Sequence, residues 1–226
     1  KIMEIIFVSS TNQAFASPVT ITDPSFDVTL LADGQYTPLN GPPAAGWTYN
    51  GGTGVFNPTN AHVTDEAQDE PNVAYSNGGS ICQILTSNIV GNTRYALSSY
   101  VGERSDGNPI VDYKIQLKEG TGHTELASVD DTTGNLPASG HLVSNEVIYT
   151  SPISGSPIGE PLEVCLSSTA TQTLFDKVSL DATTCATVPP GQVSWWPAEN
   201  NAKDILYNNP GTLPLNGVTF TPGKVG

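Results

Sequence analysis

The sequence predicts an all-β protein: an antiparallel jelly-roll β-sandwich with extra strands at its ends. Turn-forming residues recur roughly every eight to twelve residues, which is the spacing of short strands in a sandwich. The 226 residues include 22 glycines and 18 prolines, which supply those turns. Between the turns, apolar and polar residues alternate with a period of two. No segment carries a helical apolar stripe long enough to compete with this pattern.

The chain divides into four predicted parts. Residues 1–16 begin with the apolar run Ile2–Val8, expected as a strand, and continue as a polar linker. Residues 17–182 carry the regular strand pattern of the sandwich. Residues 183–192 contain paired prolines and small polar residues, which favour a linker. Residues 193–226 hold Trp195 and Trp196 but are too few to bury them alone.

Alternation within the strands predicts one buried face in each. In TRYALSSYVGER and YKIQLKEG, one face is largely apolar and the other largely polar, which is typical of half-buried antiparallel strands. The side chains expected in the core are Tyr95, Leu97, Tyr113, Ile115, Leu117, Val164 and Phe175.

The charge balance excludes some partners. Aspartate and glutamate together number 22 against 8 lysines and arginines, a formal charge of −14. This surplus repels phosphate backbones, so nucleic acid is not expected as a partner. Carboxylates suit calcium, although Asp65, Glu66, Asp69 and Glu70 lack the regular spacing of a calcium loop. No stretch reaches the roughly 20 apolar residues that span a bilayer.

Three cysteines lack the CxxC spacing of a zinc site. They are Cys82, Cys165 and Cys185. Cys82 and Cys165 both fall in the middle of expected strands, so a disulfide between them is geometrically conceivable. Two buried and unlinked cysteines are the alternative.

The sequence shows no recognisable catalytic motif. Neither GxSxG nor HExxH occurs, and no pair of carboxylates is marked for glycoside hydrolysis. His62, His123 and His141 are scattered, and we expect all three to be solvated in loops. On these grounds the sequence predicts a protein that is not an enzyme.

An ordered series of motifs carries a family resemblance over about residues 19–182. The series is SFD at 25–27, GW at 46–47, GVFNP at 54–58, NVAYSNGGSICQIL at 72–85, TRYALSSYVGER at 93–104, YKIQLKEG at 113–120 and FDKVSLDA at 175–182. It resembles the carbohydrate-binding-module-like jelly-roll domain of secreted bacterial proteins, many of which carry a PEP-CTERM sorting signal. Residues 193–226 look like the start of a laminin-G/concanavalin-A-like domain. The resemblance implies a secreted, extracellular protein.

The same resemblance implies a structural calcium ion. Related jelly-roll modules hold calcium between their first and last strands, and the matching positions here are Asp27 and Asp176. Asp27 stands where the family pattern more usually has Glu, which shortens the reach of the carboxylate. Two carboxylates brought together by strand pairing need a cation or a proton between them.

The resulting functional prediction is a non-catalytic extracellular carbohydrate-binding or adhesion module. Sugar rings stack on aromatic side chains, and the candidates for that platform are Tyr36, Trp47, Tyr49 and Tyr100. Of these, Tyr36 and Tyr49 are expected to be the more exposed, and Trp47 the more buried. The alternative is a structural subunit of an extracellular filament or surface assembly, which self-associates by donating its terminal strands to neighbours.

Overall fold

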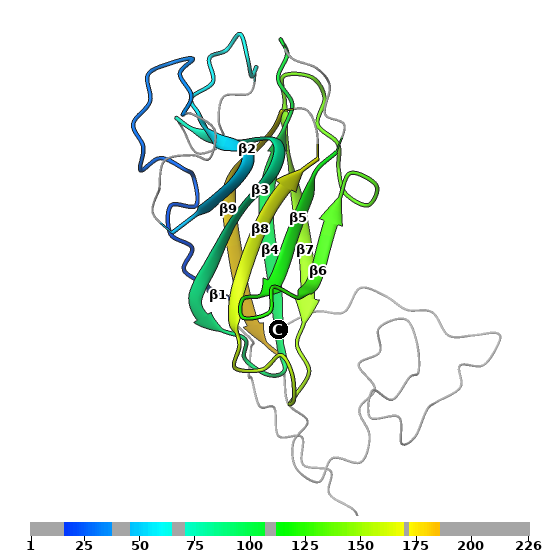
Figure 1. Cartoon of the computed structure of the whole chain (residues 1–226). Helices are drawn as coiled ribbons and strands as arrows, with labels where there is room; N and C mark the ends of the chain where they lie inside the picture. Colours follow the sequence, from blue (N-terminus) through cyan, green and yellow to red (C-terminus); the bar gives the residue numbers. More distant parts are fainter. Residues whose placement is uncertain (1–15, 38–45, 65–70, 107–111, 170–171, 186–226) are drawn as a thin grey trace, which may run out of the picture. The chain divides into compact units, whose positions relative to one another are not determined.

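The structure, a computed structural model, describes residues 16–37, 46–64, 71–106, 112–169 and 172–185. Every regular element within them is a β-strand, and all the strand pairs are antiparallel (Figure 1). This confirms the predicted fold class. The strands are β1 Ser17–Pro18, β2 Thr48–Phe56, β3 Val73–Asn88, β4 Thr93–Gly102, β5 Lys114–Glu119, β6 Glu125–Asp130, β7 Leu142–Thr150, β8 Pro161–Ser168 and β9 Thr173–Thr184.

Two layers pack face to face. One layer runs in the order β6-β5-β8-β3, with β2 on the other side of β3; the second runs β9-β4-β7, with β1 on β9. The long strand β3 joins them, because its first part pairs with β9 and its second part pairs with β8. Strands β5 and β6 also contact β7 across the sandwich. The strands of the first layer are therefore hydrogen bonded to one another and, through β3, to the second layer.

The core lies between the layers and follows the predicted alternation. In β5, Ile115 and Leu117 are fully buried while Lys114, Gln116 and Lys118 lie on the opposite, outer face. The predicted core side chains are all buried, which confirms that part of the sequence analysis: Tyr95, Leu97, Tyr113, Ile115, Leu117, Val164 and Phe175.

A glycine is required where β2 and β3 bend together. Gly79 has φ +149°, and a Cβ atom there would lie 2.1 Å from the backbone oxygen of Asn50. The register of the β2–β3 pair shifts at the same level, between Gly51 and Thr53. This bulge increases the local twist and carries both strands from one layer to the other.

Several expectations concern residues outside the described ranges. They include the strand Ile2–Val8, the acidic residues Asp65 to Glu70 and the laminin-G-like segment 193–226. Within the described ranges, β9 ends at Thr184, two residues beyond the expected boundary of the sandwich. No helix among these residues is long and apolar enough to cross a membrane.

Candidate functional site

The outer face of the first layer is hollowed into a cavity of about 360 Å³. It lies over β2, β3, β5 and β8, and the turn after β5 closes one side of it. Its volume falls within the range typical of small-molecule sites. The lining side chains are Thr48, Asn50, Cys82, Ile84, Lys118, His123 and Glu163.

A buried carboxylate lies at the bottom of this cavity. Glu163 is placed on β8 between Leu162 and Val164, whose fully buried side chains point into the core. Alternation therefore turns the Glu163 side chain to the outer face, yet only 5% of it is exposed. A charged group so enclosed needs partners.

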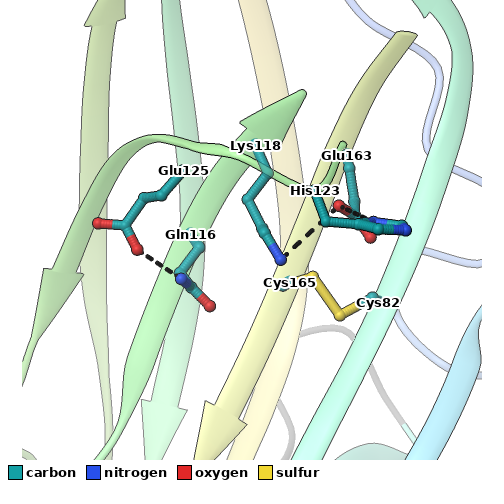
Figure 2. The surroundings of a disulfide bond; sticks show 7 residues. All are labelled: Cys82, Gln116, Lys118, His123, Glu125, Glu163 and Cys165. Carbon is teal, nitrogen blue, oxygen red and sulfur yellow. Dashed lines mark hydrogen bonds and ion pairs between the residues drawn. A yellow bond between two sulfur atoms is a disulfide. The ribbon is translucent and has the colours of Figure 1, made fainter. Parts of the chain in front are cut away.

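A histidine and a lysine supply those partners (Figure 2). His123 Nδ1 lies 2.9 Å from Glu163 Oε2, and Lys118 Nζ lies 3.8 Å from the same oxygen. The His123 side chain remains 57% exposed, so its ring reaches both the buried carboxylate and the solvent. Since Nδ1 is engaged with Glu163, Nε2 is the ring nitrogen left for a ligand. The His123 imidazole and the Glu163 carboxylate together have the atoms needed to accept, donate and relay a proton.

A tight turn places His123 over Glu163. The carboxylate of Glu119, at the end of β5, accepts hydrogen bonds from the backbone N–H groups of Thr121, Gly122 and Thr124 at 3.1–3.2 Å. These bonds, that of Gly122 first, hold the pKa of Glu119 below its usual range. His123 sits within this turn at φ +56°. The ionised Glu119 therefore fixes the turn that carries the histidine.

A disulfide forms part of the cavity wall. Cys82 on β3 and Cys165 on β8 are directly opposite in the strand register and are linked, so the first of the two alternatives for these cysteines is the one the structure adopts. Cys185 is not bonded to another cysteine. Both bridged sulfur atoms and a carboxylate oxygen of Glu163 lie within 4.8 Å of one another. In the disulfide form the sulfur atoms are not thiolates, so this group does not bind a metal.

A second carboxylate on the same face has different surroundings. Glu125 accepts hydrogen bonds from Lys114 Nζ at 2.8 Å, Gln116 Nε2 at 2.5 Å and Ser128 Oγ at 2.7 Å. These contacts, led by Lys114, lower the pKa of Glu125 to about 2. Its side chain is 38% exposed.

The segments that carry the predicted metal ligands come together at another place in the fold. The backbone N–H of Asn72 donates to Asp27 Oδ1 at 3.0 Å. The 23–28 loop is tied to β9 by a bond from the Val178 N–H to the Pro24 carbonyl, two residues from the fully buried Asp176. These bonds place Asp27 beside Asn72 and tie the loop that carries Asp27 to β9, the strand that carries Asp176.

The side-chain oxygen of Asn72 is buried without a hydrogen-bond donor. The Asn72 Nδ2 group donates to the carbonyls of Phe26 and Thr29, at 3.1 and 2.8 Å. Those two bonds fix the orientation of the amide, and Asn72 Oδ1 is left buried with no partner. An orphaned carbonyl oxygen beside a carboxylate fits a cation ligand.

The four aromatic residues proposed as a sugar platform are scattered. Trp47 and Tyr49 are buried in the main core, where Trp47 packs against Phe26 and Tyr49 is 8% exposed instead of forming an open platform. Tyr100 is half-buried against a smaller apolar cluster, with Lys177 Nζ 6.0 Å from its ring centre. Tyr36 is 68% exposed. Burial of the rings on β2 follows from their inward position on that strand.

The described residues thus form a β-sandwich with a cavity on one sheet face. A family model described as HpiC1 cyclase matches residues 17–181, and the chain belongs to this HpiC1-like family. No curated protein matches the chain in sequence.

Solved structures agree on the fold. The apo form of a cyclase from Fischerella sp. has a TM-score of 0.65 and 22% identity, covering 76% of this chain and 98% of that one. The Stig cyclase FisC from Fischerella sp. TAU, in complex with (3Z)-3-(1-methyl-2-pyrrolidinylidene)-3H-indole, has a TM-score of 0.65 and 20% identity, covering 76% and 100%. A cyclase from the same organism in complex with 4-(1H-indol-3-yl)butan-2-one has a TM-score of 0.65 and 22% identity, with the same coverage.

Family membership corrects the functional predictions. The assignment to carbohydrate-binding-module-like domains was wrong, and so were the non-catalytic adhesion function, the filament alternative and the prediction that the chain is not an enzyme, since the family is one of cyclases. The predicted glycan partner was also wrong, because the solved cyclases of this fold hold indole ligands. The quoted motifs specify jelly-roll strands, and one fold supports many functions.

The pairing of His123 with Glu163 in the cavity was not predicted from the sequence. His123 was expected to be only solvated, yet it pairs with Glu163 across 40 residues of sequence. A usable signal was present in PLEVCLSS, where alternation places Glu163 and Cys165 together on the outer face of one strand. The pattern in PLEVCLSS does not show that the turn carrying His123 lies over Glu163.

Proposed function

We propose that this protein is a cyclase that closes a ring in a small aromatic molecule by proton transfer in the sheet-face cavity. The observation that carries the proposal is the buried Glu163 carboxylate, which pairs with the partly exposed His123 in a member of a cyclase family. A proton donor and acceptor held in one cavity is what acid–base catalysis needs.

The proposed chemistry starts at His123 Nε2. A protonated imidazole donates its Nε2 proton to a carbonyl or alkene of the substrate, and an electron-rich ring carbon attacks the carbon made electrophilic. The new C–C bond closes the ring, and the attacking carbon then loses its proton to the imidazole, which restores the catalyst. Glu163 accepts the Nδ1–H bond throughout, so it orients the ring and stabilises its charged form. Lys118 adds positive charge beside the same carboxylate.

The lining of the cavity combines one apolar side chain with several polar ones, which suits an aromatic substrate that also carries polar groups. Ile84 is 52% exposed on its wall and offers an apolar surface to an aromatic ring. Thr48 and Asn50 on β2 supply hydrogen-bonding groups at the opposite side. The indole ligands of the related cyclase structures have this character, so indole-bearing molecules are the proposed substrate class.

We propose calcium as a structural ion held by Asp27, Asp176 and the Oδ1 atom of Asn72. The buried, partnerless Asn72 oxygen supports this choice, because calcium prefers carboxylate and amide oxygens. The ion would neutralise the carboxylates and tie the 23–28 loop to β3 and β9.

The activity is tested with a panel of indoles that carry alkene or ketone side chains. Ring closure onto an alkene leaves the mass unchanged and shifts retention and the NMR spectrum, while closure onto a ketone followed by dehydration removes one water. We expect turnover by the wild type and turnover lower by about 1,000-fold in Glu163→Gln. Equal turnover by both proteins would show that this cavity is not the active site, and turnover by neither would contradict the cyclase proposal for this substrate class.

Binding is measured separately with 4-(1H-indol-3-yl)butan-2-one. The ligand should raise the melting temperature of the wild type, because a molecule that binds only the folded state stabilises it. Replacing Ile84 with Asp should abolish that shift. A shift retained in full would mean that the ligand binds elsewhere.

Calcium is tested by melting the protein with chelator and then with excess calcium. Chelation should lower the melting temperature, calcium should restore it, and Asp27→Asn should remove the difference. An unchanged melting temperature on chelation contradicts the calcium proposal but leaves the cyclase proposal standing.

A further inference from the structure

The disulfide in the cavity wall lies among groups that bind transition metals. Cys82 Sγ, Cys165 Sγ and a Glu163 carboxylate oxygen are all within 4.8 Å of one another. Tetrahedral zinc sites use thiolate, imidazole and carboxylate ligands at about 2.0–2.3 Å from the metal, which places ligand atoms roughly 3–4 Å apart. Three candidate ligands are therefore already grouped at nearly the required separation.

A fourth ligand is at hand in His123. Its Nδ1 atom lies 2.9 Å from Glu163 Oε2, close to the separation of two ligands on one zinc ion. The side chain is 57% exposed and lines the same cavity as Cys82, so the proposal requires only that the ring turn from Glu163 toward the sulfur atoms. Figure 2 shows the bridged sulfur atoms beside Lys118, His123 and Glu163.

The positions of these ligands come from the sheet and not from the disulfide itself. Cys82 and Cys165 face each other in the β3–β8 register, in which Ile81 pairs with Leu166 and Gln83 pairs with Val164. Glu163 is on the same strand and outer face as Cys165. The backbone ladder therefore keeps the three groups adjacent when the sulfur–sulfur bond is open.

We propose that the dithiol form of this protein binds one zinc-like transition-metal ion through Cys82, Cys165, Glu163 and His123. Opening the disulfide takes two electrons and two protons: a phosphine reductant, with one water, becomes the phosphine oxide and leaves two thiols. Metal binding then displaces the two thiol protons. A metal ion cannot bind while the disulfide is closed, so metal binding depends on whether Cys82 and Cys165 are oxidised or reduced. This proposal goes beyond the cyclase function and does not rest on it.

The charges around the site set its strength. Two thiolates and one carboxylate together carry three negative charges, which a divalent ion offsets and which the nearby Lys118 already offsets in part. Lys118 competes with the metal for Glu163, since its Nζ atom is 3.8 Å from the same oxygen that His123 contacts. Replacing Lys118 with Met should therefore tighten metal binding.

The test is a cobalt(II) titration of the protein after reduction by a phosphine, without oxygen. We expect one cobalt per chain with thiolate-to-cobalt charge-transfer absorption, which zinc(II) then abolishes by displacement. The oxidised protein should give no such absorption. Cys82→Ser should lose the thiolate band, while Cys185→Ser, the matched control, should keep it. Glu163→Gln and His123→Ala should each weaken binding by about 10-fold or more.

Two results would overturn the proposal. One is a reduced protein with native far-UV circular dichroism that shows no thiolate–cobalt band, or a band that Cys185→Ser removes. The other is loss of the β-sheet spectrum on reduction before metal is added, because the sheet is what places the ligands. No substrate is used, so failure of the cyclase proposal leaves this result interpretable.

Discussion

Two glutamates on one sheet face differ in almost every respect except their residue type. Glu125 is 38% exposed and its carboxylate accepts three hydrogen bonds, which lower its pKa to about 2. Glu163 is 5% exposed, and its nearest partner is a histidine that is itself 57% exposed. Figure 2 shows both, Glu125 on β6 and Glu163 on β8, and β5 lies between these two strands.

In the proposed function, the difference separates a structural carboxylate from a reactive one. The fully hydrogen-bonded Glu125 has a settled negative charge and holds β5 against β6. Glu163 lies in a cavity, is shielded from water, and shares its contact with a group that can gain or lose a proton. Burial strengthens electrostatic effects on a bound molecule, whereas exposure screens them. Location on the strand, and not the residue type, therefore decides the role.

The largest effect is expected from Glu163→Gln. The change keeps the size of the side chain but removes the charge that orients and stabilises the His123 imidazolium. We expect kcat/KM for cyclisation to fall about 1,000-fold. Glu125→Gln, the matched control on the same face, should stay within about two-fold of the wild type. Similar losses in the two variants would erase the distinction between the two carboxylates.

Removal of the disulfide should have the next largest effect. Cys82 and Cys165 are 83 residues apart in sequence, so their link restricts a long loop of the unfolded chain. Changing both to Ala should lower the free energy of unfolding by about 3 kcal/mol in urea denaturation. Cys185→Ser should change it by less than about 0.5 kcal/mol. An unaltered stability in the double variant would show that the bridge does not constrain the region around Glu163.

Glu119 sharpens the comparison by acting through the turn. Glu119→Gln removes the negative charge that three backbone N–H groups of the turn bind, so His123 is less well fixed over Glu163. We expect kcat to fall about 10-fold with little change in KM, because the residue positions a catalytic group without touching the substrate. Glu119→Asp should recover part of the loss. A rise in KM alone would indicate a role in binding instead.

The smallest effect concerns Glu125 in acid. Its folded pKa of about 2 is below the ordinary value of 4.5, so the unfolded chain takes up the proton first as the pH falls. The stability that Glu125 contributes is present above pH 4.5 and is lost as the pH falls to about 2. Because the Lys114–Glu125 pair is partly exposed and screened by solvent, the free energy of unfolding should fall by less than about 1 kcal/mol. The free energy of unfolding, measured by urea denaturation from pH 5 to pH 2, should fall less steeply with pH in Glu125→Gln than in the wild type. An identical dependence on pH in the two proteins would contradict this assignment.

The fold could be predicted because its determinants are local. Alternation in β5 buries Ile115 and Leu117 and turns the lysines to the outer face, and the same two-residue period marks β4. Glycine and proline mark most of the ends. These patterns need only neighbouring residues to be read. The extracellular location drawn from the family resemblance stays a prediction.

The candidate site could not be predicted, because its parts meet only through strand register and one turn. Cys82 opposes Cys165 because β3 pairs with β8 at that register, and no local pattern states the register. His123 reaches Glu163 because the Glu119 carboxylate closes the turn between them. The proposed catalytic group is assembled from three separate segments and therefore leaves no motif in chain order, so the absence of motifs gave a wrong prediction about catalysis.

The continuous strand β3 ties the unfolding of both layers together. It is hydrogen bonded to β2, β8 and β9, so neither layer can separate without breaking bonds in the strand that the other layer shares. Its buried amides should therefore exchange with solvent only when the whole sandwich opens, and at a common rate. The same connection means that a tight ligand in the sheet-face cavity should slow amide exchange in β9 as well, on the far layer, where the ligand makes no contact.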